Sequence, residues 1–274
     1  MKNLQMKIIY NKNKLIKLIQ NDNNLGFVPT MGGIHSGHSS LIKKSLNQCK
    51  KTIVSIFINK PQFNKTADFN KYPRVNRRDI FILKKLKINY LYLPTEKQVY
   101  PEGYDKKVVI NAFSKKLCGK NRKGHFEAVV NVINNFINII KPSRIYFGEK
   151  DMQQFKIVQD FIKKKHPKIK VVSCKTIREK NGVALSSRNI HLSKEDMKKA
   201  SNIFKFLFKN KKKLIKKRPL IKQIKKKLLE LGARKIDYIE VLNINKIVKP
   251  FKKKRNIKIF IAYYIGSTRL IDNF

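Results

Sequence analysis

Two histidines stand three residues apart in a glycine-rich stretch, Pro29–His38, which reads PTMGGIHSGH. Gly32 and Gly33 allow the backbone to turn sharply and to approach a ligand closely. If a helix starts here, His35 and His38 share one face of it, and its free N–H groups favour a phosphate. Two imidazoles at this place can donate hydrogen bonds and protons to a reacting phosphate. The stretch is therefore predicted to bind the phosphates of a nucleotide.

Two further segments carry polar side chains directly after apolar runs. Gln62 follows the run Thr52–Asn59, and its amide can both donate to and accept from a ligand that has a carboxylate and a hydroxyl. Lys150 and Asp151 lie in FGEKDMQQ, Phe147–Gln154. A lysine there can neutralise charge on a phosphate, and the aspartate can bind a ribose or a metal ion carried by a nucleotide. Ligands of open α/β sheets bind at the carboxyl ends of strands, so we expect these groups to flank one crevice with the histidines.

A fourth polar segment, LSSRN at Leu185–Asn189, is a weak signal by itself. Ser186 and Ser187 are small hydrogen-bond donors, and Arg188 offers a planar fork to phosphate oxygens. Taken alone, such a segment is typical of a surface turn. Its assignment to a phosphate site depends on the other three segments.

Short apolar runs alternate with helical patterns in the first two-thirds of the chain. The predicted strands are rich in β-branched and aromatic residues; they are Leu25–Val28, which ends at Pro29, Thr52–Asn59, Asn89–Leu93, Arg144–Phe147 and Ile169–Ser173. The predicted helices are Ser39–Lys50, Val75–Lys87, Phe126–Ile140 and Met152–Lys165. Strands that alternate with helices predict an α/β fold, with a parallel sheet flanked by helices.

The pattern changes near Lys175–Lys180, where we expect a hinge. Beyond it, Ser193 is expected to cap a helix, and Gly232 to end a second one. The elements predicted here are the helices Ser193–Leu214 and Leu220–Leu231 and the strands Ile236–Leu242 and Ile257–Tyr264. The chain is therefore predicted to form a first domain over residues 1–176 and a smaller α+β domain over residues 177–274.

The composition is that of a globular protein. The chain has 274 residues, of which 42% are hydrophobic, so it can bury a sizeable core in one large or two modest domains. It contains no run of about 18 uncharged apolar residues, so no membrane span is expected, and its N-terminus does not resemble a secretory signal. The three cysteines, Cys49, Cys118 and Cys174, are widely spaced and predict neither a disulfide framework nor a zinc site. A reducing cytoplasm is the expected location.

The net charge of +47 is unusual, because small domains carry about 2–8 net charges. Basic surfaces bind the phosphates of nucleic acids, which makes a nucleic-acid-binding protein one hypothesis. The lysines, however, are spread over every segment and outnumber the arginines, whereas nucleic-acid-binding proteins cluster their charge and often use the planar fork of arginine. We therefore interpret the charge as a compositional bias.

The polar segments together resemble one known family. The pattern T-M-G-x-x-H-x-G-H is similar to the signature of the HIGH nucleotidylyltransferase superfamily, and the wider VPTMGGIHSGHSSL resembles the pantothenate synthetase (pantoate–β-alanine ligase) family. The agreeing segments follow in order along nearly the whole chain: FINKPQFN at Phe57–Asn64, KYPR at Lys71–Arg74, GHF at Gly124–Phe126, FGEKDMQQ at Phe147–Gln154, LSSRN at Leu185–Asn189 and RLIDN at Arg269–Asn273. Several motifs in order are more specific than any one alone. The family commonly reads N-P-x-Q-F, so Pro61 is shifted by one position and the loop path around Lys60 is expected to differ.

The resemblance implies an enzyme that joins (R)-pantoate and β-alanine with ATP. Pantoyl adenylate is the implied intermediate, and pyrophosphate, AMP and pantothenate are the products. The implied fold is a Rossmann-like N-terminal domain that binds nucleotide and pantoate, with the C-terminal domain as a lid. Mg²⁺ is expected to arrive with ATP, with no further metal site, and the protein is expected to be a homodimer without specific nucleic-acid or membrane partners.

The resemblance also implies roles for individual residues. His38 takes the position of a general acid, and His35, Lys150 and Arg188 act on the phosphates. Gln62 and Gln154 bind pantoate. The residues implied in ATP binding are Met31, Gly32, Gly33, Ile34, His35, Ser36, Gly37, His38, Gly148, Glu149, Lys150, Asp151, Ile177, Leu185, Ser186, Ser187 and Arg188.

Three questions stay open in the sequence. Asp79 either lies near the metal-bearing phosphates or only complements the charge at a helix N-terminus. A second hypothesis is another nucleotidylyltransferase of the superfamily, which would transfer a nucleotide to a phosphate. Gln62 and Gln154 count against it, because a phosphate substrate would require cations at these positions. The third is a nucleic-acid-binding protein with relic motifs, although the motifs are intact and no aromatic-rich RNA-binding pattern is present.

Overall fold

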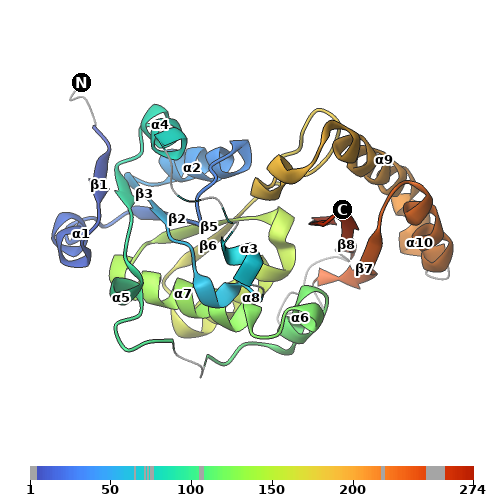
Figure 1. The fold of residues 1–274 in the computed structure, drawn as a ribbon. Coiled ribbons are helices and arrows are strands. Elements are labelled where there is room, and N and C mark those ends of the chain that lie inside the picture. The colour runs from blue at the N-terminus through green and yellow to red at the C-terminus, as the bar shows by residue number, and fades with distance from the viewer. Residues whose placement is uncertain are drawn as a thin grey trace.

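The computed structural model describes residues 5–64, 66–70, 72, 74, 77–104, 108–216, 220–244 and 257–274. Lys71 and Pro73 of the KYPR segment, and the expected start of a helix at Val75, lie outside these residues. The larger sheet is entirely parallel. Its strands, in spatial order, are β1 (Lys7–Ile9), β4 (Tyr90–Tyr92), β3 (Lys51–Ile56), β2 (Leu25–Thr30), β5 (Arg144–Gly148) and β6 (Lys170–Cys174) (Figure 1).

The order of the strands reverses between β2 and β5. From β2 the chain builds outward to β3 and β4 on one side, and β5 and β6 lie on the other. A crevice forms at such a switch point, at the carboxyl ends of the strands. The crevice predicted between the segment after β2 and the segment after β5 therefore has the strand order that it requires.

Helices cover both faces of this sheet. The longer ones are α1 (Lys12–Ile19), α2 (Ser36–Gln48), α4 (Arg77–Lys85), α7 (His125–Ile140) and α8 (Met152–Lys165). Short helical segments are η1 (Lys60–Gln62), α3 (Thr66–Asn70), α5 (Glu96–Val99), η2 (Ala112–Lys115), α6 (Cys118–Asn121), η3 (Glu149–Asp151) and η4 (Ser187–His191).

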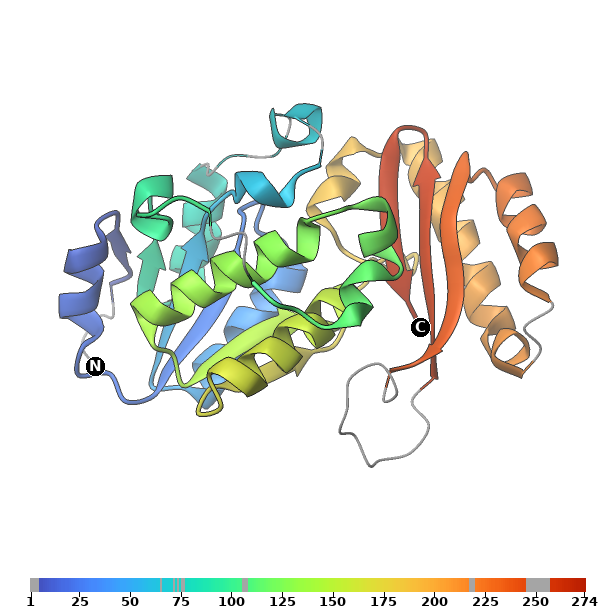
Figure 2. The ribbon, with the colours of Figure 1, turned by 90° about the horizontal axis from the view of Figure 1, so that it is seen from below.

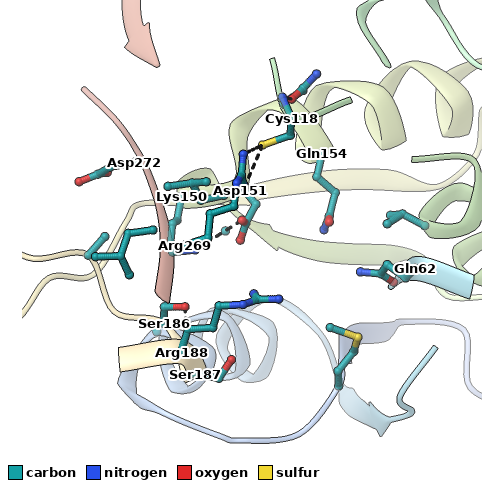
Figure 3. Close-up of a pocket in the computed structure, with 18 of the residues that line it drawn as sticks. Gln62, Cys118, Lys150, Asp151, Gln154, Ser186, Ser187, Arg188, Arg269 and Asp272 are labelled. Carbon is teal, nitrogen blue, oxygen red and sulfur yellow. Dashed lines mark hydrogen bonds and ion pairs between the residues drawn. The ribbon is translucent and has the colours of Figure 1, made fainter. Parts of the chain in front are cut away.

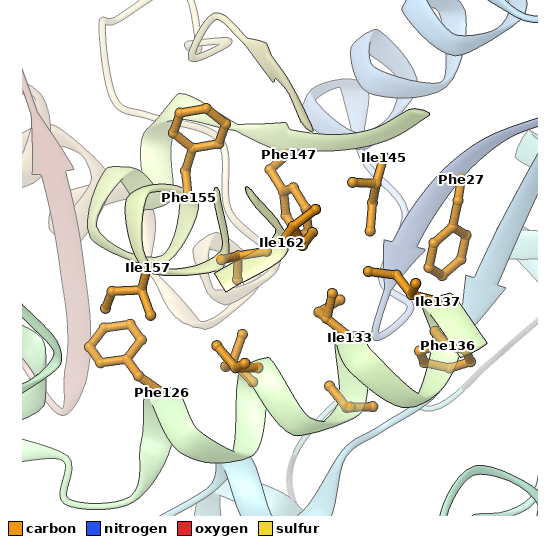
Figure 4. Packing of buried hydrophobic residues seen from close by; sticks show 14 of the residues in the cluster. Phe27, Phe126, Ile133, Phe136, Ile137, Ile145, Phe147, Phe155, Ile157 and Ile162 are labelled. Carbon is orange, nitrogen blue, oxygen red and sulfur yellow. The ribbon is translucent and has the colours of Figure 1, made fainter. Parts of the chain in front are cut away.

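Alternate strand residues enter the cores on opposite faces of the sheet. Phe27 and Ile145 pack with residues of α1, α7 and α8, and Phe136 of α7 lies 5.5 Å from Phe27 between ring centroids (Figure 4). Val28 and Tyr146, the next residues along the same strands, pack with α2 and α4 instead. This two-sided burial explains why the strands read as almost continuous apolar runs.

The C-terminal part forms a smaller antiparallel sheet in the order β7 (Lys235–Asn243), β8 (Ile257–Ile265) and β9 (Thr268–Asn273). The helices α9 (Lys194–Lys216) and α10 (Ile221–Glu230) cover one face of it (Figure 2). Ile259 and Ile261 of β8 face these helices, whereas Phe260 and Ala262 join the core of the larger sheet. The two parts of the chain thus share a packed interface, and the boundary at residues 176 and 177 stays a prediction.

The structure corrects several element predictions. β2 continues through Pro29 to Thr30. Its pairing with β5 covers only Gly26 and Phe27, so no hydrogen bond to β5 requires an N–H group at Pro29. β3 ends at Ile56 instead of Asn59, where the chain turns into η1. β1, α1 and β9 were not expected. β1 and β9 are short or polar segments with little periodic signal, whereas α1 is amphipathic, with Leu15 and Ile19 buried, and was overlooked. No helix in the described part of the chain is long and apolar enough to span a bilayer.

Candidate active site

A tight turn after β2 brings His35 to the start of α2. Gly32 and Gly33 have φ angles of 87° and 63°, which residues with a side chain rarely adopt. Asp79, in the first turn of α4, accepts hydrogen bonds from the N–H groups of Gly33 (3.0 Å) and Ile34 (2.8 Å) through its two carboxylate oxygens. The Asp79 side chain is buried. These two N–H groups are therefore bound within the protein, and the carboxylate holds the turn.

The two histidines lie against each other at the helix start. His35 is the N-cap of α2, and its Nδ1 accepts a hydrogen bond from the N–H of Gly37 (3.1 Å). The ring centroids of His35 and His38 are 4.1 Å apart. A Cβ at Gly37 would lie 2.7 Å from the His35 ring, so the glycine permits this close approach. Nδ1 of His38 is buried without a hydrogen-bond partner among the described residues.

Both histidines are neutral at pH 7. Burial, followed by electrostatic repulsion from His35 in its protonated form and from Lys150, lowers the pKa of His38 from 6.5 to about 3. Burial and the Lys150 ammonium lower the pKa of His35 to about 4. A buried site that is already positive disfavours a further proton. A phosphate group entering the site would counteract this effect.

The segment after β5 is held from the C-terminal sheet. Nδ2 of Asn273 in β9 donates hydrogen bonds to the carbonyl oxygens of Glu149 (2.8 Å) and Lys150 (2.9 Å). Nζ of Lys258 donates to Oδ1 of the same amide (2.9 Å), which fixes its orientation. The Lys150 ammonium lies 3.4 Å from Asp151, which is half exposed. Asn273 thereby ties the two sheets together at the loop that carries Lys150.

The segment with Ser186, Ser187 and Arg188 lies opposite this loop. Ser186 is the N-cap of η4, and its Oγ accepts from the N–H of Arg188 (3.3 Å). The Arg188 guanidinium forms an ion pair with Asp68 of α3 (3.1 Å). The carbonyl of Ile177 accepts from the N–H of Leu185 (3.0 Å), so these two predicted residues are neighbours across a short hairpin.

Gln62 lies in η1, at the carboxyl side of β3. Oε1 of Gln62 accepts from Nδ2 of Asn59 (3.4 Å). Its main-chain carbonyl accepts from Nδ1 of His125 (2.9 Å) and from Arg122 (3.0 Å). The shifted Pro61 occupies the first turn of η1, where no N–H is needed. Gln62 therefore keeps a defined place despite the altered loop.

The predicted side chains converge on one cavity of about 930 Å³. Figure 3 shows Gln62, Gln154 and Arg188 pointing into the same space from separate elements. The predicted residues that line the cavity are Met31, His35, Gly37, His38, Gln62, Gly148, Lys150, Asp151, Gln154, Ile177, Leu185, Ser186, Ser187 and Arg188. Five predicted residues stand behind this lining: Gly32, Gly33, Ile34, Ser36 and Glu149.

Several residues that shape the cavity carried no predicted role. Arg122, His125 and Asn59 fix the main chain and side chain of Gln62, and Asn273 fixes the loop of Lys150. His125 and Asn273 fall in the GHF and RLIDN segments, so the motif match marked these positions without indicating their contacts. Among the described residues, no group of three His, Cys, Asp or Glu side chains could hold a metal ion.

Comparison with known proteins identifies the family of this chain. The family model for pantoate–β-alanine ligase matches residues 5–274. The pantothenate synthetase of Fervidobacterium nodosum is 37% identical over 276 residues, which cover 98% of this chain and 98% of that protein. The pantothenate synthetase of Thermosipho africanus is 38% identical over 260 residues, or 94% of each chain.

Solved structures show the same likeness. The pantoate–β-alanine ligase of Francisella tularensis, complexed with beta-gamma ATP and β-alanine, matches with a TM-score of 0.82 and 34% identity, over 98% of this chain and 97% of that one. The pantothenate synthetase of Thermus thermophilus matches with a TM-score of 0.85 and 29% identity, over 98% and 99%. The expected family is confirmed: this chain belongs to the pantoate–β-alanine ligases, which condense pantoate with β-alanine in an ATP-dependent reaction.

Proposed function

We propose that the cavity carries out this condensation in two steps, through pantoyl adenylate. In the first step, a carboxylate oxygen of pantoate attacks the α-phosphorus of ATP, and pyrophosphate leaves. In the second, the amine of β-alanine attacks the acyl carbon, AMP leaves with the electron pair of the broken C–O bond, and the nitrogen loses a proton. The observation that carries this proposal is the convergence of the histidine, lysine, arginine and glutamine side chains on one cavity.

We assign the ATP phosphates to the start of α2 and the loop after β5. His35 and His38 are neutral in the free protein, so they act first as hydrogen-bond donors. The charge of a bound triphosphate raises their pKa, which lets His38 serve as the general acid for the departing pyrophosphate. Lys150 and Arg188 stabilise the negative charge of the transition state.

Pantoate is assigned to Gln62 and Gln154. Each amide can donate to one oxygen of the substrate and accept from a hydroxyl. Both residues line the cavity together with apolar groups such as Phe136 and Val129, which suit the methyl groups of pantoate. No cation is needed at this end, because the carboxylate must stay nucleophilic. Positioning of this oxygen in line with the phosphorus is the main contribution expected.

Mg²⁺ is proposed to enter with ATP. Oxygen donors suit this ion, which keeps several waters and binds through substrate phosphates with one or two carboxylates. Asp151, half exposed beside Lys150, is the carboxylate that fits this role, whereas both oxygens of Asp79 accept main-chain hydrogen bonds. When bound, the ion neutralises phosphate charge and improves pyrophosphate as a leaving group.

We further infer that the C-terminal part closes over the site, because Ser187 and Arg188 come from it. Closure would exclude water from the acyl adenylate. Solution scattering that gave the same shape with and without ATP and pantoate would count against this. The homodimer and the cytoplasmic location stay predictions.

The test is AMP release by the purified protein with ATP, Mg²⁺ and pantoate, with and without β-alanine. We expect AMP and pantothenate only when all substrates are present, and pantoate-dependent exchange of labelled pyrophosphate into ATP without β-alanine. Lys150→Met should slow both AMP release and pyrophosphate exchange by at least about 100-fold. Lys165→Met, which removes an exposed lysine from the end of α8, should leave both rates unchanged. Exchange supported by a different acid, and not by pantoate, would reassign the substrate.

A further inference from the structure

Among the described residues, three guanidinium groups line the cavity, and two of them form an ion pair with a carboxylate. Arg188 pairs with Asp68 (3.1 Å), and Arg269 pairs with Asp237 (2.7 Å). Arg122 is the third, and its hydrogen bonds to described residues go to neutral acceptors. Within the part of the chain that the structure describes, Arg122 therefore has hydrogen-bond partners but no ion-pair partner.

Arg122 is held in a fixed orientation. Its guanidinium donates to Nε2 of His125 (2.9 Å) and to the carbonyl of Gln62 (3.0 Å). An arginine can only donate, so Nε2 of His125 accepts, and Nδ1 carries the proton that it donates to Gln62 (2.9 Å). Burial, and then the neighbouring Arg122 cation, lowers the pKa of His125 to about 3, so this imidazole stays neutral.

The guanidinium itself is in an unfavourable setting without a ligand. Burial, followed by the charge of Arg188, lowers the pKa of Arg122 to about 10, and the nearby Asp68 carboxylate offsets this only in part. A buried cation whose charge is incompletely balanced costs free energy until an anion binds. A guanidinium fork that neutral acceptors fix beforehand, with no ion pair to a carboxylate of the described residues, is suited to a carboxylate ligand.

We propose that Arg122 binds the carboxylate of β-alanine. This inference rests on the proposed place of pantoate at Gln62, because the guanidinium donates to the main chain of that residue. In β-alanine the carboxylate is separated from the amine by two methylene groups. A carboxylate at Arg122 would therefore leave the amine near the acyl group of a pantoyl adenylate bound at Gln62.

The other anions of the reaction fit Arg122 less well. The carboxylate of pantoate becomes a mixed anhydride in the first step, so a cation paired with it would weaken the nucleophile and then lose its partner. The carboxylate of β-alanine stays charged from binding to product release. The phosphates of ATP are assigned to Lys150, Arg188 and the start of α2. Of these groups, Arg188 acts on the charge of Arg122 and already has Asp68 as its ion-pair partner, and the experiments below distinguish a carboxylate from a phosphate at Arg122.

The first experiment compares the two half-reactions in Arg122→Met. Loss of a hydrogen-bonded charge pair should raise KM for β-alanine by about 10- to 100-fold. Pantoate-dependent exchange of pyrophosphate into ATP needs no β-alanine, so its rate at saturating pantoate should change by less than about threefold, although KM for pantoate rises because the hydrogen bond to the Gln62 carbonyl is lost. Arg122→Lys keeps the charge but not the planar fork, so its KM for β-alanine should lie between those of the unmodified protein and Arg122→Met. A loss of exchange, or a raised KM for ATP, would place Arg122 on the phosphates and overturn the proposal.

The second experiment uses a neutral amine, 3-aminopropanamide, in place of β-alanine. The unmodified protein should prefer β-alanine by kcat/KM, and Arg122→Met should reduce this preference by about 10-fold or more. Asn59→Ala is the control, because it removes a hydrogen bond from the side chain of Gln62 and leaves both hydrogen bonds of the Arg122 guanidinium in place. It should raise KM for pantoate without altering the preference.

An equal loss toward both amines in Arg122→Met would mean that the arginine only supports Gln62, and would overturn the proposal. Failure of the underlying reaction has a different signature, because the unmodified protein would then form no pantothenate at all. Thermal unfolding of each variant shows whether it is folded. If Arg122→Met does not fold, the comparison of the two amines is made with Arg122→Lys.

Discussion

Replacement of Asp79 by Asn should weaken both the fold and the use of ATP. Asp79 accepts main-chain hydrogen bonds from Gly33 and Ile34 with its two oxygens, at 3.0 and 2.8 Å. An asparagine keeps one acceptor and turns an NH₂ group toward the other N–H. The loss of one buried hydrogen bond to a charged group corresponds to about 1.5–3 kcal/mol of unfolding free energy.

The turn that Asp79 holds leads directly to His35, so the effect should extend to catalysis. A shift of the phosphate-binding groups by a fraction of an ångström is expected to lower kcat/KM for ATP by about 10-fold or more. Urea unfolding measures the first effect, and AMP formation at varied ATP measures the second. The matched control is Asp196→Asn, which changes another first-turn aspartate, in α9, away from the cavity. A charge at a helix N-terminus contributes about 0.3–1 kcal/mol.

Two results would refute this reasoning. If Asp79→Asn and Asp196→Asn lost the same stability, with activity unchanged, Asp79 would only complement the helix dipole. If Asp79→Asn kept its stability and regained activity at high Mg²⁺ concentration, the carboxylate would act on the metal-bearing phosphates. The predicted outcome is a loss of stability and of kcat/KM that additional Mg²⁺ does not restore.

Three further predictions concern the site and its support. Burial holds the pKa of His38 at about 3, against 6.5 for an ordinary histidine, so between these pH values the unfolded chain binds a proton that the folded chain does not. The unfolding free energy should therefore fall as pH drops from 6.5 toward 3. In His38→Asn, urea unfolding at several pH values should show a slope smaller by about 1.4 kcal/mol per pH unit. Gly26→Ala should lower the unfolding free energy by about 1–3 kcal/mol, because a Cβ there collides with Oγ of Ser45; unchanged urea curves would contradict this. Asn273→Ala should lower kcat, because it releases the loop that carries Lys150. In a double-mutant cycle, adding Asn273→Ala to Lys150→Met should lower kcat little further. Additive losses would show that Asn273 does not act through Lys150.

The elements with strong patterns were predicted well. The helix Met152–Lys165 has the predicted bounds, and the five predicted strands of the larger sheet are present with ends that differ by a few residues. Their apolar runs are long because both faces of the sheet are covered. β1 and β9 were missed for the opposite reason. β1 has only three residues, KII, and β9 reads TRLIDN, whose polar residues hide its alternation.

The sequence by itself determined the chemistry available to this protein. The spacing of His35 and His38, the glycines before them and the polar residues after the apolar runs predict a phosphate site and a hydroxy-acid site, because these properties are local to short segments. The family resemblance then supplied the substrates.

Only the tertiary structure decided how these groups are held. The partner of Gly33 lies 46 positions away at Asp79, and the partner of Lys150 lies 123 positions away at Asn273. Arg122 and Gln62 are 60 positions apart. A hydrogen bond depends on distance in space, and no local pattern reports which distant donor meets which acceptor. Among the described residues, it is likewise only the folded structure that shows ion pairs at Arg188 and Arg269 and neutral hydrogen-bond partners at Arg122.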